Sequence, residues 1–136
     1  MNSFTVDANF EVTSWDEEPF DAAAGESESA VSKLTRASVR KKYSGDVDGT
    51  SATEWLMSYA ADDADGAAAF VGLERIRGTI GGHPGTLVLQ HVGQYRDGAA
   101  KATLTVLGGT DELGRVTGSG DFLADPAGSI SLSLNT

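Results

Sequence analysis

Residues 67–95 read AAAFVGLERIRGTIGGHPGTLVLQHVGQY, two apolar segments on either side of the glycine pair Gly81-Gly82. Glycine adopts positive φ without steric cost, so a glycine pair between two such segments is typical of a tight hairpin turn. The flanking segments, Ala67–Arg77 and Thr86–Tyr95, are short and rich in Val, Leu, Thr and Phe, which favours strands. The stretch therefore predicts an antiparallel β-hairpin.

The same alternation of glycine turns and short apolar segments continues in both directions from this hairpin. Further turns are indicated at Ser44-Gly45-Asp46, Asp97-Gly98 and Gly118-Ser119-Gly120. We expect eight strands in all, over Phe4–Ser14, Leu34–Tyr43, Ala52–Ala60, Ala67–Arg77, Thr86–Tyr95, Ala99–Leu107, Val116–Phe122 and Ser129–Leu134. Most connections are too short for parallel crossovers, so the strands should follow one another as antiparallel hairpins.

Eight antiparallel strands in one chain either stack as a sandwich or close into a barrel. In Phe4–Ser14 every second residue is apolar, which indicates a strand with one buried face and one face in water. Closure removes both edge strands and leaves an interior that side chains fill or that holds one small ligand. We predict an all-β, eight-stranded antiparallel up-and-down barrel, with residues 1–136 as one domain. The acidic stretch 17–32 is expected as the long connection, with a helical turn or a lid.

Charge and composition limit the classes of partner and cofactor that the protein is expected to use. The chain carries 20 acidic against 10 basic residues, a net charge of −10, which disfavours nucleic acid and anionic membranes as partners. It has no cysteine, no apolar run long enough to span a bilayer, and no visible secretory signal. The two histidines, eight residues apart with one in a turn, make a poor metal pair. We expect a cytoplasmic protein that uses no metal and no cofactor.

His91 and Glu74 are the candidate catalytic residues. His91 shares a strand face with Leu87 and Leu89, and imidazole is the usual group for proton transfer near neutral pH. If the hairpin is symmetric about Gly81-Gly82, Glu74 lies opposite Leu89 and diagonal to His91, close enough for a carboxylate–imidazole pair. The alternatives are a hydrogen-bonded core histidine, and a Glu74 on the wet face.

Aromatic and apolar side chains on the same interior face are candidates for a ligand pocket. We expect the substrate-binding residues to be Phe10, Trp55, Met57, Tyr59, Phe70 and Leu89. Tryptophan and tyrosine combine apolar surface with a polar tip, which suits a partly oxygenated molecule. Ordinary core packing is the alternative for this set.

Other charged and aromatic residues are expected outside the pocket. Glu54 should lie on the outer face or at a subunit contact, His83 in a solvated turn, and Trp15 at the rim or in a lid. Five basic residues are expected to form a solvated outer face that balances acidic neighbours, and they are Lys33, Arg36, Arg40, Lys41 and Lys42.

Three parts of the sequence together resemble a known family. They are FEVTSWDEEPF (10–20), KLTRASVRKKYSGDVDG (33–49) with TEWLMSY (53–59), and AAFVGLERIRGTIGGHPGTLVLQHVG (68–93). These resemble bacterial proteins of domain-of-unknown-function family 3224, whose fold is similar to the allene oxide cyclase barrel. The resemblance implies an antiparallel, calycin-like barrel and an oligomer, for which a homodimer is our expectation. Related barrels act without cofactors, by shaping a reactive substrate in an apolar cavity.

Two functions follow from this sequence. One is a cofactor-free cyclase, isomerase or lyase for a hydrophobic, oxygen-bearing metabolite. In this enzyme His91 would transfer the proton and Glu74 would orient the His91 side chain. The other is a binding protein with the same cavity and no turnover. A third possibility is a barrel packed too tightly to hold any ligand.

Overall fold

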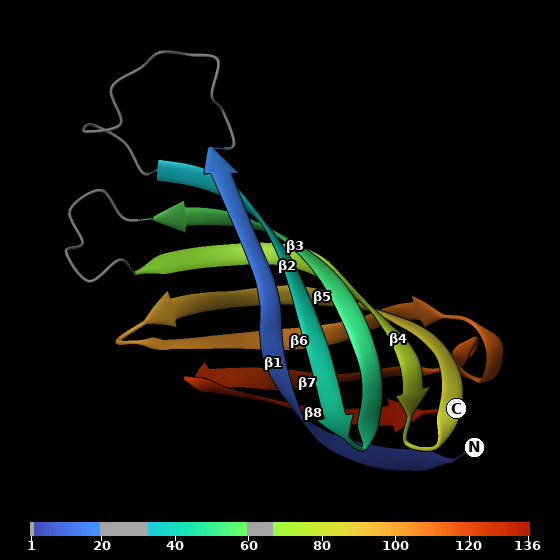
Figure 1. The fold of residues 1–136 in the computed structure, drawn as a ribbon. Coiled ribbons are helices and arrows are strands. Elements are labelled where there is room, and N and C mark those ends of the chain that lie inside the picture. Colours follow the sequence, from blue (N-terminus) through green and yellow to red (C-terminus); the bar gives the residue numbers. More distant parts are fainter. Residues whose placement is uncertain (1, 20–32, 60–66) are drawn as a thin grey trace.

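The computed structural model describes residues 2–19, 33–59 and 67–136 (Figure 1). This part of the chain forms eight β-strands and one short 3-10 helix, η2. In chain order these are β1 (Ser3–Pro19), β2 (Lys33–Gly45), β3 (Val47–Tyr59), β4 (Ala68–Ile80), β5 (His83–Arg96), β6 (Ala99–Gly109), η2 (Asp111–Leu113), β7 (Thr117–Asp125) and β8 (Ala127–Asn135).

Each strand pairs antiparallel with the next, and β8 pairs with β1 to close a barrel. Within the described residues every strand therefore has a neighbour on both sides, so none is an edge strand, as predicted. Figure 1 shows the two chain ends beside each other, where the Thr136 N–H donates to the Asn2 carbonyl across 2.9 Å. The all-β, eight-stranded antiparallel barrel is confirmed.

The β4–β5 hairpin has the predicted register. Gly81 and Gly82 form the turn, with φ of 58° and 86°. A residue with a side chain adopts such positive φ values only at an energetic cost, which glycine avoids. The turn is symmetric about them, so Gly72 pairs with His91 and Glu74 pairs with Leu89.

All eight strands are longer than predicted, and the two largest differences at a strand end, in β3 and β1, have local causes. β3 begins at Val47 instead of Ala52, because Ser51 and Thr53 point into the barrel and hide the usual apolar alternation. β1 continues to Pro19 beyond an irregularity between Val12 and Ser14, so residues 17–19 of the expected acidic connection are strand. The remainder of that connection, 20–32, lies outside the described residues.

One end of the barrel interior is packed with aliphatic side chains. Val47, Ile76, Ile80, Leu87 and Leu113 each have a relative exposure of 0% and close the barrel beside the β4–β5 turn and η2. No helix among the described residues is long and apolar enough to cross a membrane.

Candidate functional site

A single buried carboxylate, that of Glu74 on β4, organises the middle of the barrel. Its Oε1 accepts a hydrogen bond from His91 Nε2 at 2.8 Å and contacts the Lys41 ammonium at 3.3 Å. Its Oε2 accepts from the Tyr43 hydroxyl at 2.7 Å and from the Ser51 hydroxyl at 2.6 Å. Three strands, β2, β3 and β5, therefore supply donors to one carboxylate on β4, which satisfies both of its oxygens.

The tautomer of His91 follows from its two hydrogen bonds. Trp55 Nε1 lies 3.1 Å from His91 Nδ1, and an indole nitrogen can only donate. Nδ1 is therefore the acceptor, and Nε2 carries the proton that is donated to Glu74. Both ring nitrogens are occupied, which leaves neutral His91 no free lone pair.

Gly72 makes the contact between Trp55 and His91 possible. It is the cross-strand partner of both residues. A Cβ at this position would lie 2.6 Å from Trp55 Cδ1 and 2.0 Å from the Glu54 carbonyl oxygen. The missing side chain thus leaves the space in which the indole lies against the sheet.

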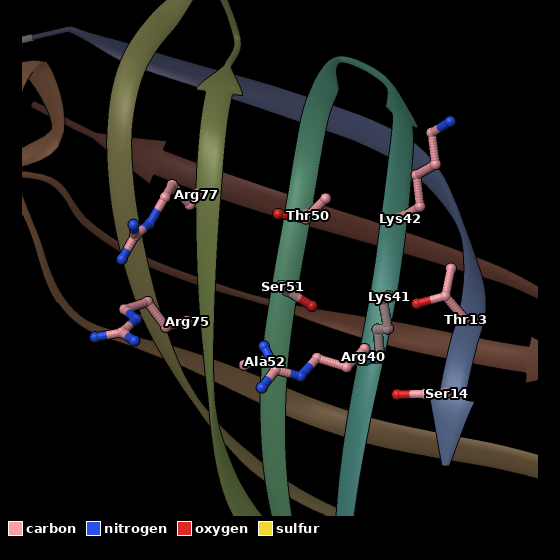
Figure 2. A pocket seen from close by; sticks show the side chains of 10 residues that line it. All are labelled: Thr13, Ser14, Arg40, Lys41, Lys42, Thr50, Ser51, Ala52, Arg75 and Arg77. Carbon is pink, nitrogen blue, oxygen red and sulfur yellow. The ribbon is translucent and has the colours of Figure 1, made fainter.

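Lys41 is buried in the barrel, so its expected place on the solvated outer face was wrong. Figure 2 views β2 from outside, with Arg40 and Lys42 on this face and Lys41 between them behind the ribbon. The side chain of Lys41 is 1% exposed. The predicted alternation of β2 explains this, because Lys41 shares its strand face with the buried Val39 and Tyr43.

Three aromatic rings surround the Lys41 ammonium. Its Nζ lies 4.5 Å from the ring centroid of Phe10, 5.0 Å from that of Phe122 and 5.3 Å from that of Trp55. These are cation–π distances, and such contacts strengthen when the cation is desolvated. Among the described residues, Glu74 is the hydrogen-bond acceptor of this ammonium.

Burial and pairing shift the pKa values of this network. Burial acts to raise the pKa of Glu74, but the Lys41 charge and the bonds from His91 and Ser51 outweigh it and lower the pKa to about 2. Burial lowers the pKa of Lys41 and that of His91, in each case against the opposing effect of Glu74. Burial, with the charge of Glu74, raises the pKa of Tyr43. At neutral pH the network therefore holds an ionised Glu74 and a neutral His91.

A cavity of about 300 Å³ lies between this network and the end of the barrel that carries the β5–β6 and β7–β8 turns. Its lining includes Gly98 in the first of these turns and Pro126 in the second. The remaining wall residues are Phe10, Val12, Trp15, Lys41, Trp55, Met57, Phe70, Tyr95, Ala100, Phe122 and Ala124. Lys41 is the one charged side chain in this lining.

The structure brings four of the six expected substrate-binding residues to the cavity wall, namely Phe10, Trp55, Met57 and Phe70. Leu89 is fully buried in the barrel core and Tyr59 is half-buried, and neither lines the cavity. Glu74 and His91 are in contact as predicted but lie behind the wall, with 0% side-chain exposure. Lys41 is the member of the network that reaches the cavity.

A second polar cluster lies near the end of β1. Glu17 Oε2 accepts from Thr35 and from the Tyr59 hydroxyl, both at 2.6 Å, and its Oε1 accepts from Trp15 Nε1 at 3.1 Å. Burial and the bond to Glu17 raise the pKa of Tyr59 to about 12. The indole of Trp15 lies 5.6 Å from that of Trp55 and is 47% exposed, which fits the expected rim position.

The other polar residues lie as expected, apart from Lys41. Glu54 is exposed on the outer face, where its carboxylate contacts Ser38 and Arg36. The side chain of His83 is 41% exposed beside Glu112. Within the described ranges no three His, Cys, Asp or Glu side chains gather as metal ligands.

An outer groove of about 540 Å³ crosses β1 to β4 above this network (Figure 2). Arg40 and Lys42 of β2 and Arg75 and Arg77 of β4 flank the small side chains of β3. This groove is separated from the cavity by the sheet itself.

Comparisons with known proteins agree with the fold. The family described as "Protein of unknown function (DUF3224)" matches residues 6–135. A crystal structure of a protein of unknown function from the same family, from Shewanella oneidensis MR-1, is 24% identical over 98% of each chain, with a TM-score of 0.74. No curated protein matches the chain.

Proposed function

Because this chain belongs to the DUF3224 family of proteins of unknown function, we propose a function argued from the barrel itself: it binds one small hydrophobic molecule whose oxygen atom pairs with Lys41. The observation that carries the proposal is a buried lysine in the lining of an otherwise uncharged, largely aromatic cavity, with its ammonium beside three of the aromatic rings of that lining.

The ammonium has capacity for a further acceptor. Lysine offers three N–H donors, and the described residues provide Glu74 as their hydrogen-bond acceptor. A buried donor without a partner is costly, so a ligand oxygen placed beside Nζ would gain a charge-assisted hydrogen bond. The aromatic walls would hold the apolar remainder of the ligand.

The reaction class that suits this arrangement is a cofactor-free isomerisation, cyclisation or lyase step. An ammonium beside a carbonyl or ether oxygen stabilises negative charge that develops there during enolisation or ring rearrangement. In this proposal Lys41 is the group that touches the substrate, and Glu74 is a positioning residue that holds it. His91 also acts as a positioning residue, because both of its ring nitrogens are engaged.

We also propose that the barrel belongs to the allene-oxide-cyclase-like, calycin-like group. Support comes from the consecutive antiparallel order of the eight strands and from a cavity inside the barrel near one of its ends. This likeness concerns architecture and supports a dry binding site more than any particular reaction.

A binding protein without turnover is the second candidate, and one observation favours it. Neither Glu74 nor His91 lines the cavity, so the wall lacks an evident base to take a proton from carbon. The two candidates share the ligand site and differ in whether a proton leaves the bound molecule.

A matched pair of probes tests the binding proposal. We expect 2-acetylnaphthalene to bind more tightly than 2-ethylnaphthalene in calorimetry, because only the ketone offers an acceptor to Lys41. The preference for the ketone should disappear in Lys41→Met and in Lys41→Met/Glu74→Gln. The double variant is included because it leaves no unpaired buried charge. The preference should persist in the outer-face control Lys42→Met. Equal affinity for both probes in the wild-type protein, or no binding of either, would contradict the proposal.

Proton exchange separates the two candidates. If the protein is an enzyme, 2-acetylnaphthalene bound in D₂O should take up deuterium at its acetyl methyl group faster than it does in buffer alone. NMR measures this uptake. Uptake at the buffer rate, with Lys41-dependent binding retained, would favour the binding protein.

A further inference from the structure

Lys41 combines three properties that favour a covalent bond between its amine and the carbonyl carbon of a ligand. It is the one amine on the cavity wall, its surroundings are apolar, and a carboxylate lies 3.3 Å from its nitrogen. Resting on the proposed function, we infer that the substrate class is an aldehyde or ketone and that Lys41 forms an imine with its carbonyl carbon.

The step balances without any co-reactant. The Lys41 nitrogen bonds to the carbonyl carbon, the C–O bond breaks, and the oxygen leaves as water with two protons from the ammonium. The products are a protonated imine and water. One positive charge is present on the nitrogen before and after, and no electron acceptor or donor takes part.

The surroundings of Lys41 suit the product as well as the free ammonium. The rings of Phe10, Trp55 and Phe122 face a cation in both states. Glu74 stays available as the counter-ion because its charge is held by Tyr43, Ser51 and His91. A protonated imine would therefore keep the ion pair and the cation–π contacts that the free lysine makes.

The cavity also favours condensation over the reverse hydrolysis. Its walls are mainly aromatic and aliphatic, and the lining around Nζ offers few polar groups to hold the released water. Burial lowers the pKa of Lys41, which raises the share of nucleophilic free amine. The exposed Lys42, the next residue along β2, has the same side chain without this environment.

Reductive trapping tests the inference on the wild-type protein. The probe is 2-naphthaldehyde with sodium cyanoborohydride, which reduces an imine to a stable secondary amine. Intact mass and peptide mapping then locate the adduct. We expect the fastest adduct on Lys41, formed about tenfold or more faster than those at Lys42 or Lys101, because a bound carbonyl beside the amine reacts as if intramolecular.

Two controls separate the site from general lysine reactivity. An excess of 2-ethylnaphthalene, which fills the cavity without a carbonyl, should slow labelling of Lys41 and leave that of Lys42 unchanged. In Lys41→Met/Glu74→Gln the fast adduct should be lost, while Lys42→Met should retain it.

The outcomes distinguish this inference from the proposed function. Adducts on surface lysines alone, with Lys41-dependent binding of 2-acetylnaphthalene intact, would overturn the imine and leave the binding site standing. Loss of that binding as well would overturn both. Fast, competable labelling of Lys41 would support both.

Discussion

The indole Nε1–H of Trp55 donates to Nδ1 of His91 across 3.1 Å, and this bond assigns the imidazole proton to Nε2. It joins the cavity wall to the buried carboxylate, since Trp55 lines the cavity and His91 donates to Glu74. The wall and the ion pair behind it are thus linked by an indole, an imidazole and a carboxylate.

Trp55→Phe tests that link. The variant keeps an aromatic ring but leaves Nδ1 as a buried acceptor without its donor, which should cost about 1–3 kcal/mol of unfolding free energy in urea. Long-range ¹H–¹⁵N NMR should show a single Nε2–H tautomer for His91 in the wild-type protein and a loss of that uniformity in the variant. Phe70→Leu is the control, because it alters the wall without touching Nδ1. A mixed tautomer in the wild-type protein would contradict the assignment.

Acid should destabilise the fold through Glu74 and His91. The pKa of Glu74 is lowered to about 2 from 4.5, so its contribution is present above pH 4.5 and is lost as the pH falls toward 2. This contribution is on the order of 3 kcal/mol. The pKa of His91 is also lowered, from 6.5, so protonation of the unfolded chain reduces stability as the pH falls below 6.5.

Urea unfolding at a series of pH values measures this dependence. The difference between the wild-type protein and Lys41→Met/Glu74→Gln should shrink as the pH is lowered from 4.5 to 2. The variant Glu54→Gln, which alters an exposed carboxylate, should follow the wild-type curve. A constant difference across this pH range would show that Glu74 is not held ionised in the fold.

The hairpin explains why the Glu74–His91 pair could be predicted from the sequence. Its two-residue glycine turn sets one symmetric register, and a strand period of two then places both side chains on one face. The same reasoning could have found Lys41, which alternates with Val39 and Tyr43. The surrounding run of basic residues suggested a solvated strand and masked that signal.

Two further features needed the structure. The polar inward face of β3, with Ser51 and Thr53, becomes understandable only when Glu74 of the next strand is known to lie beside it. The barrel interior is divided into one end packed with aliphatic side chains and a cavity toward the other end. This division depends on which strands face each other across the closed barrel. Alternation along single strands carries no such information.

The buried ion pair should behave as a coupled unit. Lys41→Met leaves the Glu74 carboxylate without its counter-charge and should cost about 3–5 kcal/mol, because an uncompensated charge stays in the core. Glu74→Gln should have a comparable cost for the opposite reason. The double variant should lose less than the sum of the two, which a double-mutant cycle in urea measures. Lys42→Met should change the unfolding free energy by less than about 0.5 kcal/mol, and additive single effects would contradict the coupling.

Thr53 is the clearest target for stabilising the barrel. Its hydroxyl is buried at 0% exposure and is the one buried side-chain polar atom without a hydrogen-bond partner among the described residues. Thr53→Val replaces that hydroxyl with a methyl group of similar shape, so it should raise the unfolding free energy by about 1 kcal/mol. The exposed Thr103→Val on β6 is the matched control and should be close to neutral. A loss of stability in Thr53→Val would show that the hydroxyl has a partner, such as a buried water molecule, that the valine displaces.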